Sequence, residues 1–239
     1  MRRIRKTVQT LDFACIDQYS FSMNIFVIRH GETDWNKQFR LQGRTEIPLN
    51  DTGRAQAQKT AEGLKAQGIF FDAVYASPLC RAVETAEILS GFPREKIRTD
   101  ERIIELSFGK AEGTTPADRR NNPALIGINA FFQSPNEYIA EDGAESLQHA
   151  LKRTADFWES EIKSLESTHK NVLVATHGGT LQALLLHIDG RTLAQYWDVK
   201  IPNCTVNLVT LSGGIFRVEY TAKVFYEGEF AWTSDSFAK

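Results

Sequence analysis

Two histidines stand at equivalent places in the chain, each at the end of an apolar run. His30 follows Asn24-Ile-Phe-Val-Ile-Arg29 and His177 follows Asn171-Val-Leu-Val-Ala-Thr176, and a glycine comes next in both cases. Each run is rich in β-branched residues, which predicts a buried strand. Parallel strands end at the same edge of a sheet, and open α/β sheets bind their ligands there. The sequence therefore predicts a site with two histidines at that edge.

Three further charged residues favour phosphate chemistry at this site. Arg29 directly precedes the first histidine, Arg81 lies in the first turn of a predicted helix, and Glu105 lies in a later loop. A tetrahedral dianion needs fixed positive charge and several donors, which guanidinium groups supply better than ammonium groups. A helix start adds free backbone N–H groups that bind an anion. These residue types together indicate a phosphate-binding pocket.

A histidine in such a pocket can form a covalent phosphohistidine, provided that its imidazole is neutral when it attacks. We expect Arg29, Arg81 and a protonated His177 to lower the pKa of His30, because like charge disfavours its imidazolium form. The same charges would stabilise the transferring phosphoryl group. Glu105 is the candidate acid that protonates the leaving alkoxide and the base that later activates water.

Several motifs occur in a fixed order around these residues. They are Arg29-His30-Gly-Glu-Thr33, Ser77-Pro-Leu-Cys-Arg81, Ile104-Glu105-Leu-Ser-Phe-Gly109, Gly143-Ala-Glu145-Ser146, Thr176-His177-Gly-Gly179 and Ile201-Pro-Asn203-Cys204. In this order they resemble the histidine phosphatase superfamily, also called phosphoglycerate mutase-like, over about residues 24 to 211.

The resemblance implies a role for each matching position. His30 would be the phosphorylated nucleophile, Arg29, Arg81 and His177 would form the phosphate pocket, and Glu105 would donate the proton. The remaining substrate-binding positions that it implies are Asn36, Gln42, Gly43, Gly178 and Asn203. The resemblance implies no metal ion and no organic cofactor, and its substrate would be a small phosphomonoester.

The chain departs from the mutase branch of this family between Glu105 and Glu145. Mutases carry a long insertion there with an arginine pair that grips the substrate, and by a loose alignment the nearest counterpart in this shorter segment is Phe131-Phe132. An apolar segment at this place favours a less anionic substrate, or one with an apolar or ring-like leaving group. We therefore expect a phosphomonoester hydrolase that acts on a small phosphorylated metabolite.

Other interpretations of the same residues stay open. The chain can be a cofactor-dependent phosphoglycerate mutase, a protein phosphatase, or a non-catalytic module that binds phosphorylated ligands. The two histidines can also be core residues, and the charged residues a buried ion-pair network. The sequence leaves open which phosphomonoester would be the substrate.

The elements that position these residues alternate between strands and helices. We predict strands at about 24–29, 71–76 and 171–176, helices at about 52–67, 79–89, 146–165 and 181–186, and a hairpin at 205–224 that extends the edge of the sheet. Right-handed crossovers between them predict an α/β fold, a three-layer α/β/α sandwich with a mostly parallel central sheet, phosphoglycerate mutase-like.

Local signals refine this outline. Ser77-Pro78 predicts a helix cap followed by proline at the first helical position. Residues 114–142 are polar and turn-rich around Phe131-Phe132, which predicts a partly helical lid. We expect a single catalytic domain over 23–239, preceded by an N-terminal extension at 1–22 that the fold does not need.

Composition restricts the partners and the compartment. The 239 residues are 42% hydrophobic, which suits one large α/β domain, and a net charge of −2 supplies no broad basic field for nucleic acid or an anionic membrane. Cys15, Cys80 and Cys204 show no paired spacing, which argues against a disulfide framework or a zinc cluster and favours a reducing compartment. We expect a cytoplasmic monomer or homodimer without a nucleic-acid or membrane partner.

Overall fold

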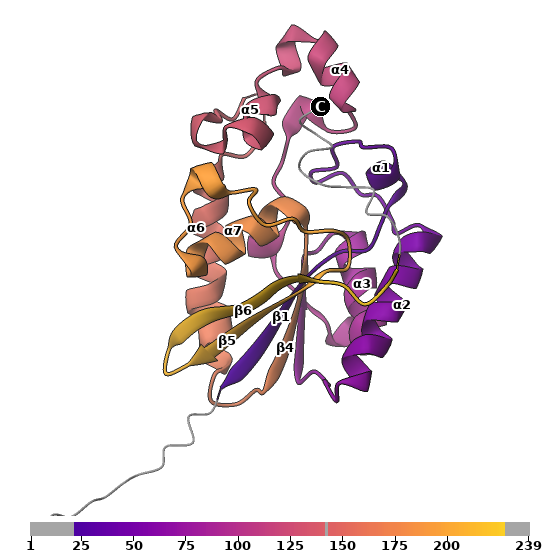
Figure 1. Ribbon diagram of the computed structural model, residues 1–239, viewed down its shortest axis with the longest axis vertical. Helices are drawn as coiled ribbons and strands as arrows, with labels where there is room; N and C mark the ends of the chain where they lie inside the picture. Colours follow the sequence, from indigo (N-terminus) through magenta and orange to yellow (C-terminus); the bar gives the residue numbers. More distant parts are fainter. Residues whose placement is uncertain (1–21, 142, 228–239) are drawn as a thin grey trace, which may run out of the picture.

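A sheet of six strands forms the centre of the fold, with helices on both of its faces (Figure 1). The computed structural model describes residues 22–141 and 143–227, so the predicted extension lies outside the described residues except for Ser22. Across the sheet the strand order is β3-β2-β4-β1-β5-β6. The strands are β1 (Met23–Arg29), β2 (Ala73–Ala76), β3 (Arg98–Thr99), β4 (Asn171–Thr176), β5 (Val206–Ser212) and β6 (Ile215–Lys223).

Helices connect most of these strands. The α-helices of the described residues are α1 (Asp34–Lys37), α2 (Asp51–Ala66), α3 (Cys80–Ser90), α4 (Pro116–Asn121), α5 (Ile128–Gln133), α6 (Leu147–Asp156) and α7 (Gly178–Asp189). Short 3₁₀ helices occur at Arg94–Lys96, Glu101–Ile103, Gly109–Ala111, Pro123–Leu125, Pro135–Glu137, Lys163–Leu165 and Leu193–Gln195. Among the described helices, none is both long enough and apolar enough to span a bilayer.

The central strands are parallel, as predicted. β1 pairs in parallel with β4, and β4 and β3 pair in parallel with β2, whereas β5 and β6 form an antiparallel hairpin at the edge. The register places Arg29 opposite Thr176. His30 and His177 therefore leave two neighbouring strands at the same level of the same sheet edge.

Successive side chains of a strand point to opposite faces of the sheet. Different helices cover these two faces, so alternate residues of each strand pack against different helices. Phe26 and Ile28 pack with residues of α2 and α3 on one face. Ile25 and Val27 pack on the other face with Leu184 of α7 and with the chain that continues α6. This arrangement confirms the predicted three-layer sandwich.

Most predicted helix bounds agree with the structure. Asn50 caps α2 by accepting a hydrogen bond from the N–H of Gly53, and Ser146 caps α6 by accepting one from His149. The helix that begins at α6 continues as a π-helix at Phe157–Ile162, which confirms the long helix expected from its apolar spacing. The strand expected at 71–76 is shorter, because regular pairing begins only at Ala73.

The predicted cap at Ser77 is wrong. Helix α3 begins at Cys80, and Leu79 precedes it without a side-chain cap. Pro78 disfavours helical backbone at the residue before it, so Ser77 continues the direction of β2 and its N–H donates to the carbonyl of Ala175. The Ser77 hydroxyl lies instead 2.6 Å from Nε2 of His177.

The segment at 114–141 is partly helical, as expected. It contains α4 and α5, which lie together at the upper end of the molecule in Figure 1. Phe131 and Phe132 are both buried, and they pack with Leu41 and Phe108 in a cluster separate from the two clusters on the sheet faces.

The packing of α7 against the sheet gives a test of this core. We expect Leu184→Ala to lower the free energy of unfolding by about 2–5 kcal/mol, because a buried leucine loses its contacts and leaves a cavity. The matched control is Ile139→Ala, whose side chain is 75% exposed and whose loss should cost less than about 0.5 kcal/mol. Urea unfolding measures both values, and equal losses would contradict this account of the core.

Candidate active site

His30 is held so that one ring nitrogen is free. The side chain is buried, and its Nδ1 lies 2.7 Å from the carbonyl oxygen of Gly31. A carbonyl oxygen can only accept, so Nδ1 carries the proton and Nε2 keeps its lone pair. The backbone thus fixes a tautomer of His30 whose Nε2 is a potential nucleophile.

Both histidines are neutral at neutral pH. Burial lowers the pKa of His30 well below its usual value of 6.5, and the nearby charges of Arg81 and Arg29 lower it further. This confirms the expected direction for His30. The expectation of a protonated His177 is wrong, because burial, followed by the charge of Arg81, also lowers the pKa of His177 well below 6.5. The two rings lie 5.2 Å apart between centroids.

Two guanidinium groups supply the positive charge of the site. Nη1 of Arg29 donates to the carbonyl of Ile201 at 2.7 Å, and burial lowers the pKa of Arg29 to about 10. Arg81 donates to the carbonyls of Thr45 at 2.8 Å and Gly43 at 2.6 Å, and burial lowers its pKa as well. Carbonyl groups orient these donors without cancelling their charge.

Glu105 rests on the first turn of α7. Its carboxylate accepts hydrogen bonds from the N–H groups of Gly179 at 3.1 Å and Thr180 at 3.0 Å, and from the hydroxyl of Thr180 at 3.2 Å. A helix N-terminus is a favourable place for a carboxylate. A Cβ at Gly179 would lie 2.9 Å from Oε1 of Glu105, so the glycine permits this close approach.

Hydrogen bonds also hold four of the other predicted substrate-binding positions, Asn36, Gln42, Gly43 and Asn203. Asn203 donates from Nδ2 to the carbonyl of His30 at 2.9 Å and to Oδ1 of Asn36 at 3.2 Å. Thr33 donates from its hydroxyl to Oε1 of Gln42 at 3.1 Å. Gly43 has a φ of +53°, a conformation that glycine adopts without strain, and this turn directs its carbonyl to Arg81.

Many of these residues line one pocket, whose lining has a polar part and an apolar part. The predicted residues that line it are Arg29, His30, Asn36, Gln42, Gly43, Arg81, Glu105 and Gly178. His177 and Asn203 are not among the residues that line it, but each lies against one that does: the ring of His177 lies beside that of His30, and Asn203 donates to the carbonyl of His30. Glu105 is the carboxylate that the described residues contribute to this lining, and Arg40 adds a further cation.

The apolar part of the lining includes an aromatic wall, which we define as Phe108, Phe131, Phe132 and Trp197. The ring of Phe131 contacts those of Phe108 and Trp197 edge to face, at 5.1 and 5.2 Å between centroids. Phe132 stacks on Trp197 at 5.6 Å with an angle of 24° between their planes. The predicted apolar pair thus lines the same pocket as His30.

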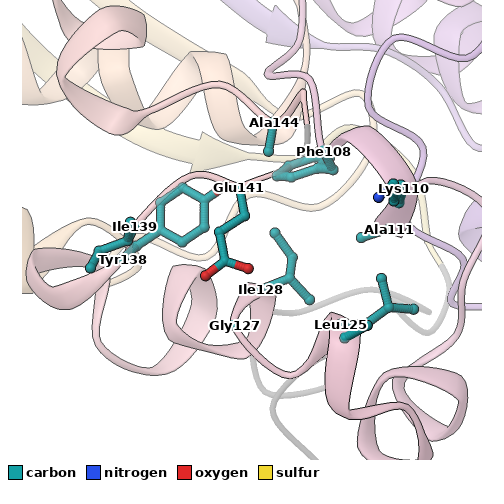
Figure 2. A pocket seen from close by; sticks show the side chains of 11 residues that line it. Phe108, Lys110, Ala111, Leu125, Gly127, Ile128, Tyr138, Ile139, Glu141 and Ala144 are labelled. Carbon is teal, nitrogen blue, oxygen red and sulfur yellow. The ribbon is translucent and has the colours of Figure 1, made fainter.

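Phe108 also forms part of a second hollow, beside the start of α5. Figure 2 shows Ile128, Leu125, Tyr138 and Glu141 around this hollow, with Phe108 at its border. The part of the chain that the structure describes contributes no histidine and no arginine to it. Among the described residues, histidine and arginine side chains thus line the first pocket and not this hollow.

Three residues that support the site were not predicted to be part of it. Ser77 contacts His177, and Thr85 accepts a hydrogen bond from the N–H of Gly31 at 3.0 Å. The carboxylate of Glu112 accepts hydrogen bonds from the N–H groups of Arg44, Thr45 and Phe108, which fixes the turn around Gly43. Ser77 lies four residues before Arg81 and Thr85 lies four residues after it. This spacing is the feature of the sequence from which their place near the site could have been predicted.

Comparison with known proteins agrees with this geometry. The sequence model of the histidine phosphatase superfamily (branch 1) matches residues 25–223. The chain is 30% identical over 203 residues to the 2,3-bisphosphoglycerate-dependent phosphoglycerate mutase of Clavibacter sepedonicus, covering 74% of this chain and 81% of that protein. It is 34% identical over 166 residues to the uncharacterized phosphatase PhoE of Bacillus subtilis, covering 70% and 77%.

A solved structure is also similar. YhfR of Bacillus stearothermophilus superposes with a TM-score of 0.76 at 30% identity, and the match covers 84% of this chain and 98% of that chain. The fold described above is therefore shared with YhfR over most of the described residues.

The two buried imidazoles should make stability depend on pH. Because folding holds both pKa values below 6.5, the unfolded chain binds more protons as the pH falls through 6.5, and the free energy of unfolding decreases. We expect a loss of about 1 kcal/mol per histidine for the first pH unit below about 6.5. Urea unfolding at several pH values measures this slope.

The cause of this slope is checked with one double variant and one control variant. The double variant His30→Asn/His177→Asn should lose stability less steeply on acidification than the wild type. Phe70→Ala, which changes an exposed side chain away from the pocket and no titratable group, should leave the slope unchanged. Equal slopes in the wild type and the double variant would contradict the neutral state of the two imidazoles.

Proposed function

Because the chain belongs to the histidine phosphatase superfamily (branch 1), we propose that it hydrolyses phosphomonoesters through a phosphohistidine on His30. One observation carries this proposal. The N–H at Nδ1 of His30 is used by the carbonyl of Gly31, so the lone pair on Nε2 is available beside the buried guanidinium groups of Arg29 and Arg81. A neutral imidazole next to fixed positive charge suits attack on a phosphate dianion.

In the first proposed step, Nε2 of His30 attacks phosphorus while the bond from phosphorus to the ester oxygen breaks. Glu105 gives its proton to the leaving oxygen, so that an alcohol departs. The positive charge that develops on the imidazole of His30 is stabilised by the hydrogen bond to Gly31. The guanidinium groups of Arg29 and Arg81 balance the charge on the phosphoryl oxygens.

In the second proposed step, Glu105 takes a proton from a water molecule, and the resulting hydroxide attacks phosphorus. The bond from phosphorus to Nε2 then breaks, which releases inorganic phosphate and restores neutral His30. Asn36, Gln42, Gly43 and Gly178 would hold the substrate as part of the polar lining, and Asn203 would orient His30 and Asn36.

The aromatic wall supports hydrolysis of esters with an apolar or ring-like leaving group. In this proposal residues 114–142 are the lid of a single catalytic domain, and Phe131 and Phe132 turn toward the leaving group from α5. An aromatic surface gains little from contact with a charged carboxylate such as that of phosphoglycerate. The mutase named among the relatives makes phosphoglycerate isomerisation the alternative to test.

The proposed reaction is tested by phosphate release from a panel of phosphomonoesters that includes 3-phosphoglycerate, with the same tubes assayed for 2-phosphoglycerate. We expect His30→Ala to reduce kcat by about 10³-fold or more, because the covalent route is lost. His169→Ala, which removes a histidine away from the pocket, should keep full activity. A wild type that forms 2-phosphoglycerate in the presence of the bisphosphate primer, without releasing phosphate, would favour the mutase.

The aromatic wall is tested by Phe132→Ala. We expect KM for phenyl phosphate to rise about three- to tenfold, which corresponds to one aromatic contact, and KM for glycerol phosphate to change little. Phe70→Ala is the control, because this phenylalanine is 65% exposed and does not line the pocket. An equal rise for both substrates would mean that Phe132 maintains the shape of the pocket without contacting the leaving group.

A further inference from the structure

Ser77 contacts the second histidine of the pocket from the end of β2. The serine is fully buried, and its backbone N–H donates to the carbonyl of Ala175 in β4 at 2.9 Å. Its hydroxyl oxygen lies 2.6 Å from Nε2 of His177. The serine is therefore fixed between two parallel strands with its hydroxyl directed at the imidazole.

The direction of this hydrogen bond follows from the other neighbours of the hydroxyl. The backbone N–H of Leu79 donates to the Ser77 oxygen at 3.4 Å. Among the residues that the structure describes, no carbonyl or carboxylate oxygen accepts from this hydroxyl, so Nε2 of His177 is the acceptor within reach. Nε2 therefore carries the lone pair, and the single proton of a neutral ring lies on Nδ1.

The opposite tautomer is less favourable. With the proton on Nε2, Ser77 would accept the hydrogen bond, and its own hydroxyl hydrogen would have no acceptor in a buried position. A buried donor without a partner costs about 1–3 kcal/mol. The low pKa of His177 keeps the ring neutral, so that its two tautomers remain distinct states.

Nδ1 of His177 is available for the reaction. It is buried and has no hydrogen-bond partner among the described residues, and its ring lies 5.2 Å from that of His30. His30 uses its Nδ1–H internally and offers a lone pair, whereas His177 would use Nε2 internally and offer an N–H. The nitrogens that the two imidazoles leave without a protein partner, within the part of the chain that the structure describes, thus have opposite polarity.

We propose that Ser77 is a positioning residue that holds His177 as the Nδ1–H tautomer, so that Nδ1 donates a hydrogen bond to the phosphoryl group transferred to His30. This inference rests on the proposed function of the pocket. A lone pair at Nδ1 would instead repel the phosphoryl oxygens. Ser77 needs no contact with the substrate for this effect.

The tautomer can be measured in the resting protein, independently of activity. We expect long-range ¹H–¹⁵N correlation spectra of the histidine-labelled full chain to show His177 protonated at Nδ1, with its signals assigned by their loss in His177→Asn. In Ser77→Ala the Nε2–H tautomer should become populated. We expect kcat to fall about tenfold or more, while KM changes less than about threefold, because a preorganised donor acts mainly in the transition state.

Two further variants serve as controls. Ser90→Ala removes a comparable hydroxyl at the far end of α3, where it donates to the carbonyl of Ala86, and should change neither the tautomer nor kcat. Ser77→Thr keeps the hydroxyl and should keep the Nδ1–H tautomer and most of kcat.

Three results would overturn the proposal. They are an Nε2–H tautomer in the wild type, full kcat in Ser77→Ala, and a loss of kcat in Ser77→Ala with the tautomer unchanged, which would assign Ser77 a purely structural role. Failure of the proposed function gives a different result, because a wild type that releases phosphate from no ester still reports the tautomer of His177.

Discussion

The burial of two guanidinium groups beside two imidazoles is the constraint on which the rest of the site depends. Removing a cation from water costs several kcal/mol unless hydrogen bonds and opposite charge compensate. Arg81 is compensated by the carbonyls of Gly43 and Thr45, and Glu105 is the one carboxylate that the described residues contribute to the pocket lining. The loop that carries these carbonyls must therefore be held rigidly, and Glu112 holds it through the N–H groups of Arg44 and Thr45.

The same burial sets the protonation of the histidines. An imidazolium in this pocket would meet both desolvation and the charges of the arginines, so both rings stay neutral. Hydrogen bonding then decides which nitrogen of His30 carries the proton, because its Nδ1 lies against the carbonyl of Gly31. The neutral charge of both imidazoles and the tautomer of His30 are thus fixed before a ligand enters. The consequence is a lower stability of the fold at acidic pH.

The sequence predicted the fold correctly where a local pattern is compatible with only one type of structure. The two apolar runs that end in His30 and His177 predicted parallel strands and a shared edge, because β-branched runs of that length pack in buried sheets. Arg29, Arg81 and Glu105 were predicted to lie together at the same site, and the structure places all three with His30 in the lining of one pocket.

Other features depend on contacts that no local pattern encodes. Ser77 before proline was interpreted as a cap, although its hydroxyl reaches a residue one hundred positions away in the chain. The protonated state expected for His177 was wrong because the extent of its burial depends on how β2, β4 and α7 pack together. The second role of Phe108, at the border of two hollows, likewise follows only from the position of α4 and α5.

Two residues of the aromatic wall and the charged groups of the pocket come from different parts of the chain. The arginines, histidines and glutamate lie near the strand ends and the start of α7, whereas Phe131 and Phe132 belong to α5, in a cluster separate from the two sheet faces. Substitutions in α5 can therefore reshape the apolar side of the pocket without moving a charged group of the sheet edge. The scaffold is modular in this sense, and in the proposed reaction a change of leaving group requires no change among the charged groups.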